Sequence, residues 1–445
     1  MDGVFAAYLA VVALAHALPP ATHNENYRIR HVLHAATQLA RGTPLAEVLD
    51  RHNRGDDAGS TLLLSLLIQR TFPAEELRTS VPEKAPRSYY LILLAGNAAA
   101  FTILYPAVRS LMNRGVAFAL GTIYLWSPAS RFVWFAGDVY FFPIYAAILM
   151  LAAAALIRHD GRLPTVLFGL CLVGIAGCNF FRQGSALVAC LLLLILIWPE
   201  CFAGRRPTRR LRLKAGLGLL VVALLTTVPA RLIGRTNHLL WHPLHCGLAE
   251  FGGHTDAAGR LYPYFVPARD LPPDTVPVHA WSDDLQFALA RQVNPAIEAA
   301  SREYEAVIRD DFLRLVREYP LGVAGLMARR AWRVVNLNPW VGHGPDSAVK
   351  EDATGPFWRL GWILLVLLGG WLGYLRRELL LVLGLTPLLL PVLLVHSGYT
   401  MYNLSAQFPL YLLSLAALHK LTGLKRRGEA VLAESGLDAG ESIRR

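Results

Sequence analysis

Residues 164–181 (PTVLFGLCLVGIAGCNFF) and 184–199 (GSALVACLLLLILIWP) are two uncharged apolar runs, and the basic run RRPTRRLRLK follows at 205–214. Each apolar run is close to the roughly 20 residues that a helix needs to cross the hydrocarbon core of a bilayer. Lys and Arg are enriched in the cytoplasmic loops of membrane proteins. The pattern therefore predicts a pair of membrane-spanning helices that is followed by a cytoplasmic loop.

Further apolar runs lie on both sides of this pair. They are found near 3–19, 88–108, 113–130, 139–157, 214–230, 357–375, 378–396 and 406–420. Of the 445 residues, 54% are hydrophobic and 17% are charged, against about 25% charged in soluble domains. We therefore predict an all-α, polytopic transmembrane bundle of about ten spans with helical extracytoplasmic loops.

Basic residues predict the orientation of the spans. Short connectors after alternate spans carry Arg109 and Arg114, then Arg158 and Arg162, then the 205–214 run, Arg376 and Arg377. By the positive-inside rule both termini are cytoplasmic, in what we expect to be the inner membrane of a bacterial cell. The formal charge of +11 lies mainly at the ends of apolar runs, so we expect no nucleic-acid partner.

This topology divides the chain into four parts. Residues 1–230 form an N-terminal membrane module with a long external loop at 20–87, and 231–356 form an extracytoplasmic helical segment. Residues 357–421 return to the membrane, and 422–445 form a cytoplasmic tail. Long external segments are where a membrane enzyme would place its chemistry.

The first external loop begins with HNENYRIR at 23–30. Apolar residues at helical spacing predict an amphipathic helix over 28–41, and a second short helix is expected over 43–52. The run TLLLSLLIQ at 61–69 is too short to span a bilayer. It is predicted to be a helix that lies on the membrane surface or dips into it.

A first span followed by a long external loop of surface helices resembles the lipid-dependent GT-C glycosyltransferases. That superfamily includes the protein mannosyltransferases and the lipid A aminoarabinose transferases, and the resemblance covers most of the chain. Its members place an acidic residue just beyond the first span, where Glu25 stands here, although Asp is more usual there. The resemblance implies inverting transfer of a sugar from a polyprenyl-phosphate donor to a glycan, lipid or protein acceptor.

The chemistry of that reaction fits the residues around Glu25. An acceptor hydroxyl needs a base, and a departing phosphate needs cationic or hydrogen-bonding groups. Glu25 can supply the first, and Arg28 and Arg30 the second. Glu25 can equally solvate the loop or cap the 28–41 helix. Other carboxylates of this loop remain rivals for the base: Asp50, Asp56 and Asp57.

Two shorter external turns also carry charge. Arg131 and Asp138 stand in an apolar, aromatic segment at 127–143, and the resemblance implies a second acidic site residue at Asp138. A simple surface ion pair between the two is the alternative. Arg182, in the turn at 178–185, can bind a lipid phosphate or extend to the lipid headgroups.

The large external segment opens with residues suited to a sugar substrate. His238, Trp241 and His242 can hydrogen-bond to a sugar or stack on it. We expect no metal or other cofactor, because Pro243 should break a helix carrying His238, His242 and His245. Pro295 is expected to start a helix, and 317–335 is expected to be a basic amphipathic helix in the outer membrane interface.

Two other functions compete with the glycosyltransferase. An O-antigen ligase or polysaccharide polymerase has a similar number of spans but usually lacks a long first external loop. A lipid or glycan flippase or transporter should carry ionisable residues near mid-membrane. The centres of the predicted spans carry none, so the enzyme is preferred, with an active-site cavity between the 20–87 loop and the 231–356 segment.

The predicted topology can be tested with reporter fusions and cysteine accessibility. A fusion within 205–214 should report a cytoplasmic location, and fusions within 20–87 and 231–356 an external one. External labelling between 205 and 214 would overturn the arrangement.

Overall fold

The computed structural model describes residues 2–17, 27–48, 58–109, 142–157, 161–181, 208–232, 240–278, 284–297 and 301–336, with a few isolated positions elsewhere. Most of these residues are helical, as the sequence predicts, and they include one small three-stranded sheet. The predicted spans near 113–130, 184–199 and beyond 357 lie almost wholly outside the described residues. The ten-span bundle therefore stays a prediction.

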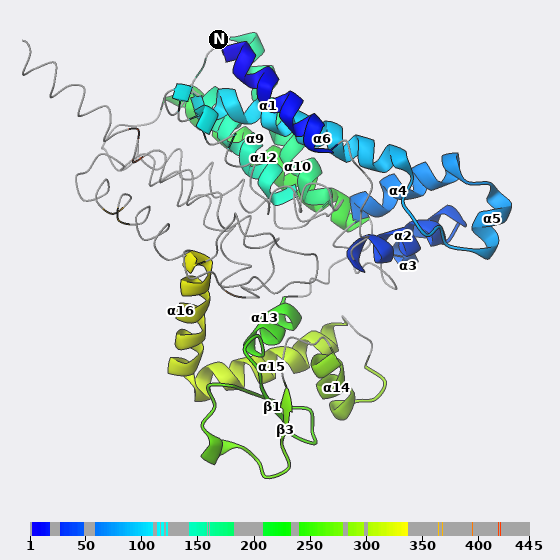
Figure 1. Cartoon of the computed structure of the whole chain (residues 1–445), viewed down its shortest axis with the longest axis vertical. Coiled ribbons are helices and arrows are strands. Elements are labelled where there is room, and N and C mark those ends of the chain that lie inside the picture. The colour runs from blue at the N-terminus through cyan, green and yellow to red at the C-terminus, as the bar shows by residue number, and fades with distance from the viewer. Residues whose placement is uncertain are drawn as a thin grey trace, which may run out of the picture.

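Five long apolar helices lie side by side in what we call the helix bundle (Figure 1). They are α1 (Asp2–Ala17), α6 (Arg87–Arg109), α9 (Phe142–Leu156), α10 (Arg162–Phe181) and α12 (Arg209–Leu232). Each coincides with a predicted apolar run, and each packs against the next in the order given. In the described part of the chain, α10 alone has the length and hydropathy to cross a membrane, with 20 residues and a mean hydropathy of 1.9.

Contacts between helix ends show how the bundle helices alternate in direction. The Phe5 and Tyr105 rings are 5.8 Å apart, so α1 begins beside the end of α6. The Phe142 and Phe181 rings stack at 4.6 Å, so α9 begins beside the end of α10. Lys214 Nζ donates to the carbonyl oxygen of His159 at 2.8 Å, so α12 begins beside the end of α9.

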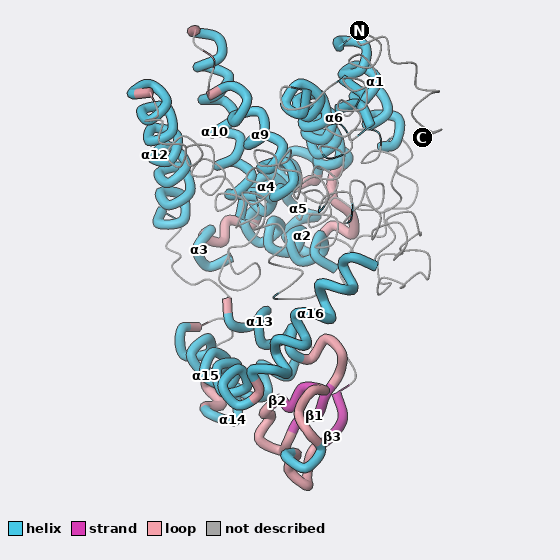
Figure 2. The backbone as a smooth tube through the Cα atoms, turned by 90° about the vertical axis from the view of Figure 1, so that its left-hand side faces the viewer, coloured by secondary structure: helices cyan, strands magenta, loops and turns pink. Residues whose placement is uncertain are grey.

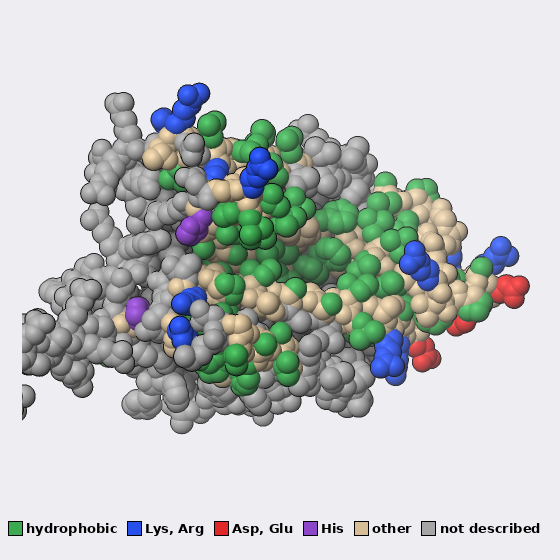
Figure 3. Space-filling model, turned by 90° about the horizontal axis from the view of Figure 1, so that it is seen from above, with side chains coloured by type: hydrophobic (Ala, Val, Ile, Leu, Met, Phe, Trp, Pro, Cys, Tyr) green, Lys and Arg blue, Asp and Glu red, His purple; other side chains and the backbone are tan. Residues whose placement is uncertain are grey.

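This alternation gathers basic residues at one end of the bundle. The described ones are Arg109, Arg162, Arg209, Arg212 and Lys214. Figure 3 looks onto the molecule from above and shows Lys, Arg and His side chains among hydrophobic ones there, whereas acidic side chains are seen only at the right-hand edge. We call this the basic end of the bundle.

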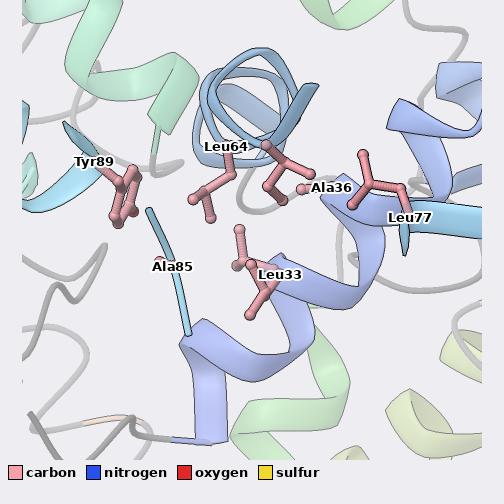
Figure 4. Close-up of a cluster of buried hydrophobic side chains, with 8 residues drawn as sticks. Leu33, Ala36, Leu64, Leu77, Ala85 and Tyr89 are labelled. Carbon is pink, nitrogen blue, oxygen red and sulfur yellow. The ribbon is translucent and has the colours of Figure 1, made fainter. Parts of the chain in front are cut away.

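Four shorter helices form a cap at the opposite end: α2 (Tyr27–Ala40), α3 (Leu45–Val48), α4 (Ala58–Thr71) and α5 (Ala74–Thr79). The helices predicted over 28–41 and 61–69 are thus confirmed as α2 and α4. The one predicted over 43–52 is helical at 45–48, and 49–52 lie outside the described residues. The cap packs around buried residues of α2, α4 and α5, of the chain leading into α6 and of the first turn of α6 (Figure 4): Val32, Leu33, Ala36, Leu64, Ile68, Leu77, Ala85 and Tyr89.

The cap joins the bundle where α4 meets α10. A side chain at Gly59 would place its Cβ 2.9 Å from Cδ1 of Phe180 and 3.0 Å from the Phe181 ring. Only a glycine allows the two helices this close approach. The end of α10 is therefore held against the cap.

Residues 240–336 form a separate packed unit, which we call the 240–336 unit. It contains α13 (Trp241–Leu248), α14 (Asp284–Val293), α15 (Arg302–Glu318), α16 (Pro320–Asn336) and the short 3-10 helix η3 (Ala268–Asp270). Its antiparallel strands β1 (Gly253–Thr255), β2 (Leu261–Pro263) and β3 (Val276–Val278) have the order β2-β1-β3.

The sheet is a correction to the all-α prediction. Each strand has three residues, too few for an alternating pattern to appear in the sequence. The turn between β1 and β2 depends on Gly259, which adopts a positive φ of 73° and donates its N–H to the Asp256 carbonyl oxygen at 3.0 Å. Such a backbone conformation favours glycine.

The predicted helix start at Pro295 is also wrong. α15 begins at Arg302, where the Ser301 side chain accepts a hydrogen bond from the Tyr304 N–H at 3.1 Å, and Pro295 lies in the turn after α14. A serine cap satisfies a backbone donor that the helix itself leaves free. The amphipathic helix predicted over 317–335 is confirmed as α16.

The cap and the 240–336 unit lie toward the same end of the bundle, away from the basic end (Figure 2). Chain direction explains this arrangement. The cap connects the end of α1 to the start of α6, and the 240–336 unit follows the end of α12. The two segments predicted to be external therefore share one side of the molecule.

The cap core can be tested with two leucines of α4. Leu64 is fully buried and Leu66 is 58% exposed. We expect Leu64→Ala to lower the stability of the cap by about 2–5 kcal/mol, because it leaves a cavity in a packed core. Limited proteolysis of the detergent-purified protein should show faster cleavage within 58–80, whereas Leu66→Ala should cleave like the wild type. Equal cleavage rates for the two variants would contradict this packing.

Candidate functional site

Several predicted site residues lie outside the described residues. These are Glu25, Asp138, Arg131, Arg182 and His238, together with the rival carboxylates Asp50, Asp56 and Asp57. Arg28 and Arg30 fall in the first turn of α2, and Trp241 and His242 fall in the first turn of α13. For most of this predicted site, the structure therefore describes only the helix ends that adjoin the predicted residues in the sequence.

Three of those helix ends lie on the cap side of the bundle. Tyr27, two residues after Glu25, begins α2 in the cap. Phe142, four residues after Asp138, stacks on Phe181, the residue before Arg182, with ring centroids 4.6 Å apart. Phe181 lies against α4 of the cap at Gly59. Segments distant in the sequence therefore reach the same side of the molecule.

The best-described polar cluster surrounds α13 in the 240–336 unit. The Glu305 carboxylate accepts hydrogen bonds from the backbone N–H groups of Leu240, Trp241 and His242 at 3.0, 2.8 and 3.2 Å. The first N–H groups of a helix have no partner within it, and the helix dipole favours a negative charge there. A carboxylate of α15 therefore fixes the start of α13.

His242 and Trp241 both point into the unit. His242 is 6% exposed, its Nδ1 lies 2.5 Å from the Tyr304 hydroxyl oxygen, and its Nε2 lies 3.7 Å from Cys246 Sγ. The Trp241 ring packs near the Phe312 ring with centroids 5.7 Å apart. In this arrangement both predicted substrate-binding side chains contact other residues of the unit.

Pro243 was expected to break a helix carrying His238, His242 and His245. α13 begins at Trp241, after His238, but Pro243 does not separate His242 from His245. Pro243 stands in the first turn of α13, where a backbone N–H would have no acceptor within the helix and its absence costs nothing. His242 and His245 therefore share one helix. His254 lies on β1 instead.

His245 is at the centre of a buried chain of polar contacts. Its Nε2 lies 2.9 Å from Asp311 Oδ2, and its Nδ1 lies 2.9 Å from Gln286 Nε2. Asp311 Oδ1 accepts from Arg314 Nε at 2.9 Å, and Arg314 Nη1 donates to Glu318 at 2.9 Å. Both ring nitrogens of His245 are thus engaged within the protein.

The pKa of the Asp311 carboxyl is lowered. Burial alone raises that pKa, but the hydrogen bond and charge of His245, together with the charge and hydrogen bond of Arg314, outweigh it. Favourable contacts to the ionised form of a carboxyl group have this effect. Asp311 is therefore ionised at neutral pH and holds α13 to α15.

A buried ion pair joins the other end of α13 to α16. Arg330 Nε donates to Glu250 Oε2 at 2.8 Å, and the two side chains are 0% and 1% exposed. Arg333 Nη1 donates to Glu250 Oε1 at 3.1 Å, and Arg330 Nη2 donates to the Gly247 carbonyl oxygen. Burial lowers the pKa of Arg330, although Glu250 opposes this change.

These contacts have little signature in the sequence. Glu305 and Asp311 both lie on α15. Glu250, Asp311 and Arg330 resemble ordinary surface charges in a sequence. The one local signal was the spacing of His242, His245 and Cys246, which places all three on one side of a helix.

No group of three or more His, Cys, Asp or Glu side chains within the described ranges could hold a metal ion. His242 and His245 contact partners from α14 and α15.

No family model, curated protein or solved structure matches this chain.

Asp311 provides a test of the buried network. A carboxyl whose pKa is lower in the folded state stabilises that state above its unfolded pKa, about 3.9. This stabilisation is lost as the pH falls through the lowered folded value. Asp311→Asn should therefore lose about 1–3 kcal/mol at pH 7, and the difference from the wild type should shrink as the pH falls below about 4.

The neighbouring Asp310 is the matched control, because its side chain is 68% exposed and pairs with Arg309 at the surface. Thermal unfolding in detergent, followed by tryptophan fluorescence at pH 7 and pH 3, compares Asp311→Asn with Asp310→Asn. Equal Tm values for the two variants at pH 7 would show that the His245–Asp311 contact does not stabilise the unit.

Proposed function

We propose that this chain is a polytopic membrane glycosyltransferase of the GT-C type. It would transfer a sugar from a polyprenyl-phosphate donor to a glycan, lipid or protein acceptor outside the cytoplasm. The bundle would be the described part of about ten membrane spans. The cap and the 240–336 unit would form the extracytoplasmic face.

The exposed surface of the bundle supports the membrane placement. In α10, Leu163, Val166 and Leu170 are 68%, 58% and 60% exposed, and in the window that could cross a membrane only 33% of residues are buried. In α12, Leu213, Leu217, Leu220 and Leu224 are 50–63% exposed. Apolar stripes of this kind are costly in water and favourable against lipid.

The distribution of charge agrees with this placement. The described bundle helices carry Asp, Glu, Lys and Arg only near their ends. Five basic residues lie at the basic end, and Arg87 and Arg231 lie at the other end. Basic residues favour the cytoplasmic side. The cap and the 240–336 unit then belong on the outer side.

The observation that carries the proposed reaction is that three helix ends lie on the cap side of the bundle. The starts of α2 and α9 and the end of α10 lie there. Glu25, Asp138 and Arg182 are each within four residues of one of these ends. We therefore propose that the carboxylates of Glu25 and Asp138 and the guanidinium of Arg182 share one site at the outer membrane surface.

In the proposed reaction, Glu25 takes the proton of the acceptor hydroxyl. The oxygen of that hydroxyl attacks the anomeric carbon of the donor sugar. The bond from that carbon to the lipid phosphate breaks with inversion, and the polyprenyl phosphate leaves as an anion. Arg28, Arg30 and Arg182 stabilise the negative charge that develops on it. Asp138 and Arg131 complete the site, and His238 and the half-buried Trp241 contact the substrate. His242 is left out of the site, because its ring is 6% exposed and contacts Tyr304 inside the unit.

A transporter fits these observations less well. Transported ions or polar substrates usually need ionisable residues near mid-membrane. None of the described bundle helices carries such a residue between its ends. A ligase or polymerase shares the proposed donor chemistry, and the acceptor used in the assay separates it from a GT-C transferase.

The proposal is tested on Glu25. General-base catalysis contributes about 10²–10⁴-fold, so Glu25→Gln should lower transfer from a radiolabelled lipid-linked sugar in membranes by about that factor. Donor binding and membrane insertion should be unchanged, and Glu25→Asp should retain partial activity because it keeps the carboxylate.

Glu75→Gln is the control, since Glu75 is an exposed carboxylate of α5 in the same cap, and it should transfer sugar normally. Normal sugar transfer by Glu25→Gln would show that Glu25 is not the base. The candidates for the base would then be Asp138, Asp50, Asp56 and Asp57. Absence of transfer by the wild-type protein with every lipid-linked sugar tested would remove the proposed function.

A further inference from the structure

Arg329 of α16 is held over two aromatic rings at the surface of the 240–336 unit. Its Cζ atom lies 4.0 Å from the centroid of the Phe251 ring and 5.3 Å from that of Tyr264, and the two rings meet edge to face at 5.8 Å. At such a distance the positive charge of the guanidinium is attracted to the face of the aromatic ring.

The Arg329 guanidinium is exposed, and no carboxylate in the described part of the chain forms an ion pair with it. The carboxylate on this side of α16, Glu250, binds Arg330 and Arg333 instead. α16 itself contains no acidic residue. An exposed guanidinium that is held against aromatic rings suits an oxyanion.

The position of α16 indicates where that anion comes from. α16 rises from the 240–336 unit toward the bundle (Figures 1 and 2), so its C-terminal half lies on the side of the unit that faces the bundle. Trp332 is 55% exposed and lies one turn beyond Arg329, on the same side of the helix. Exposed Trp beside Arg is typical of surfaces at the level of the lipid headgroups.

We propose that Arg329, stacked on Phe251 and Tyr264, binds the phosphate of an anionic membrane lipid and so seats the 240–336 unit on the outer membrane surface. Trp332 enters the headgroup layer beside the bound lipid. The inference rests on the proposed membrane placement and not on the sugar transfer. Lipid contact and transferase activity can therefore fail independently.

Photocrosslinking of the full chain tests this site. Trp332 is replaced by p-benzoylphenylalanine, and the protein is reconstituted in phosphatidylcholine nanodiscs that contain radiolabelled phosphatidylglycerol. Illumination should crosslink phosphatidylglycerol several-fold more than labelled phosphatidylcholine at the same mole fraction. Arg329→Gln should reduce this preference several-fold, and Arg329→Lys should reduce it less, because charge is kept and the planar stacking is lost.

Arg291→Gln is the matched control, since Arg291 is an exposed arginine at the end of α14, and it should crosslink like the parent protein. Equal crosslinking of the two lipids, or an unchanged preference in Arg329→Gln, would overturn the proposal. Loss of the lipid crosslink on adding millimolar inorganic phosphate would also overturn it, by showing that the site takes a free anion. Transferase activity measured on the same samples separates this outcome from failure of the proposed reaction.

Discussion

The Glu250–Arg330 ion pair connects the end of α13 to the middle of α16, with both side chains out of contact with solvent. A charge buried in this way needs both its partner and further hydrogen bonds, because the cost of removing it from water is several kcal/mol. Arg333 and the Gly247 carbonyl oxygen supply those further bonds. The pair thereby fixes where α16 crosses the unit, and with it the position of Arg329 over Phe251.

The same requirement governs the other end of α13. Glu305 satisfies the first N–H groups of the helix, and Asp311 faces His245. Both carboxylates come from α15. An eight-residue helix that would be marginal on its own is thus held by ionic contacts at its start, middle and end.

The bundle differs from the 240–336 unit, because its described helices carry charge only near their ends. Alternating chain direction then brings the described basic ends to one side and leaves the cap and the 240–336 unit on the other. Gly59 allows α4 to approach the Phe180–Phe181 end of α10 closely. This contact links the cap to the side of the bundle where the proposed site lies. A reaction at a membrane surface needs such an arrangement, in which polar groups from distant segments share one face of an apolar scaffold.

Elements that depend on local pattern can be predicted from the sequence. Apolar runs predict the bundle helices and α4, and amphipathic patterns predict α2 and α16, because a helix forms between residues a few positions apart. The sequence did not reveal the three-residue strands, the start of α15 or the role of Pro243, which depend on single turns and caps. Only the tertiary structure decided which charges are buried together. The partners His245 and Asp311 are 66 positions apart, and Glu250 and Arg330 are 80 positions apart. A charged residue on an amphipathic helix has the same local pattern whether it faces water or an opposite charge. The physical difference arises only when packing removes the water from both partners.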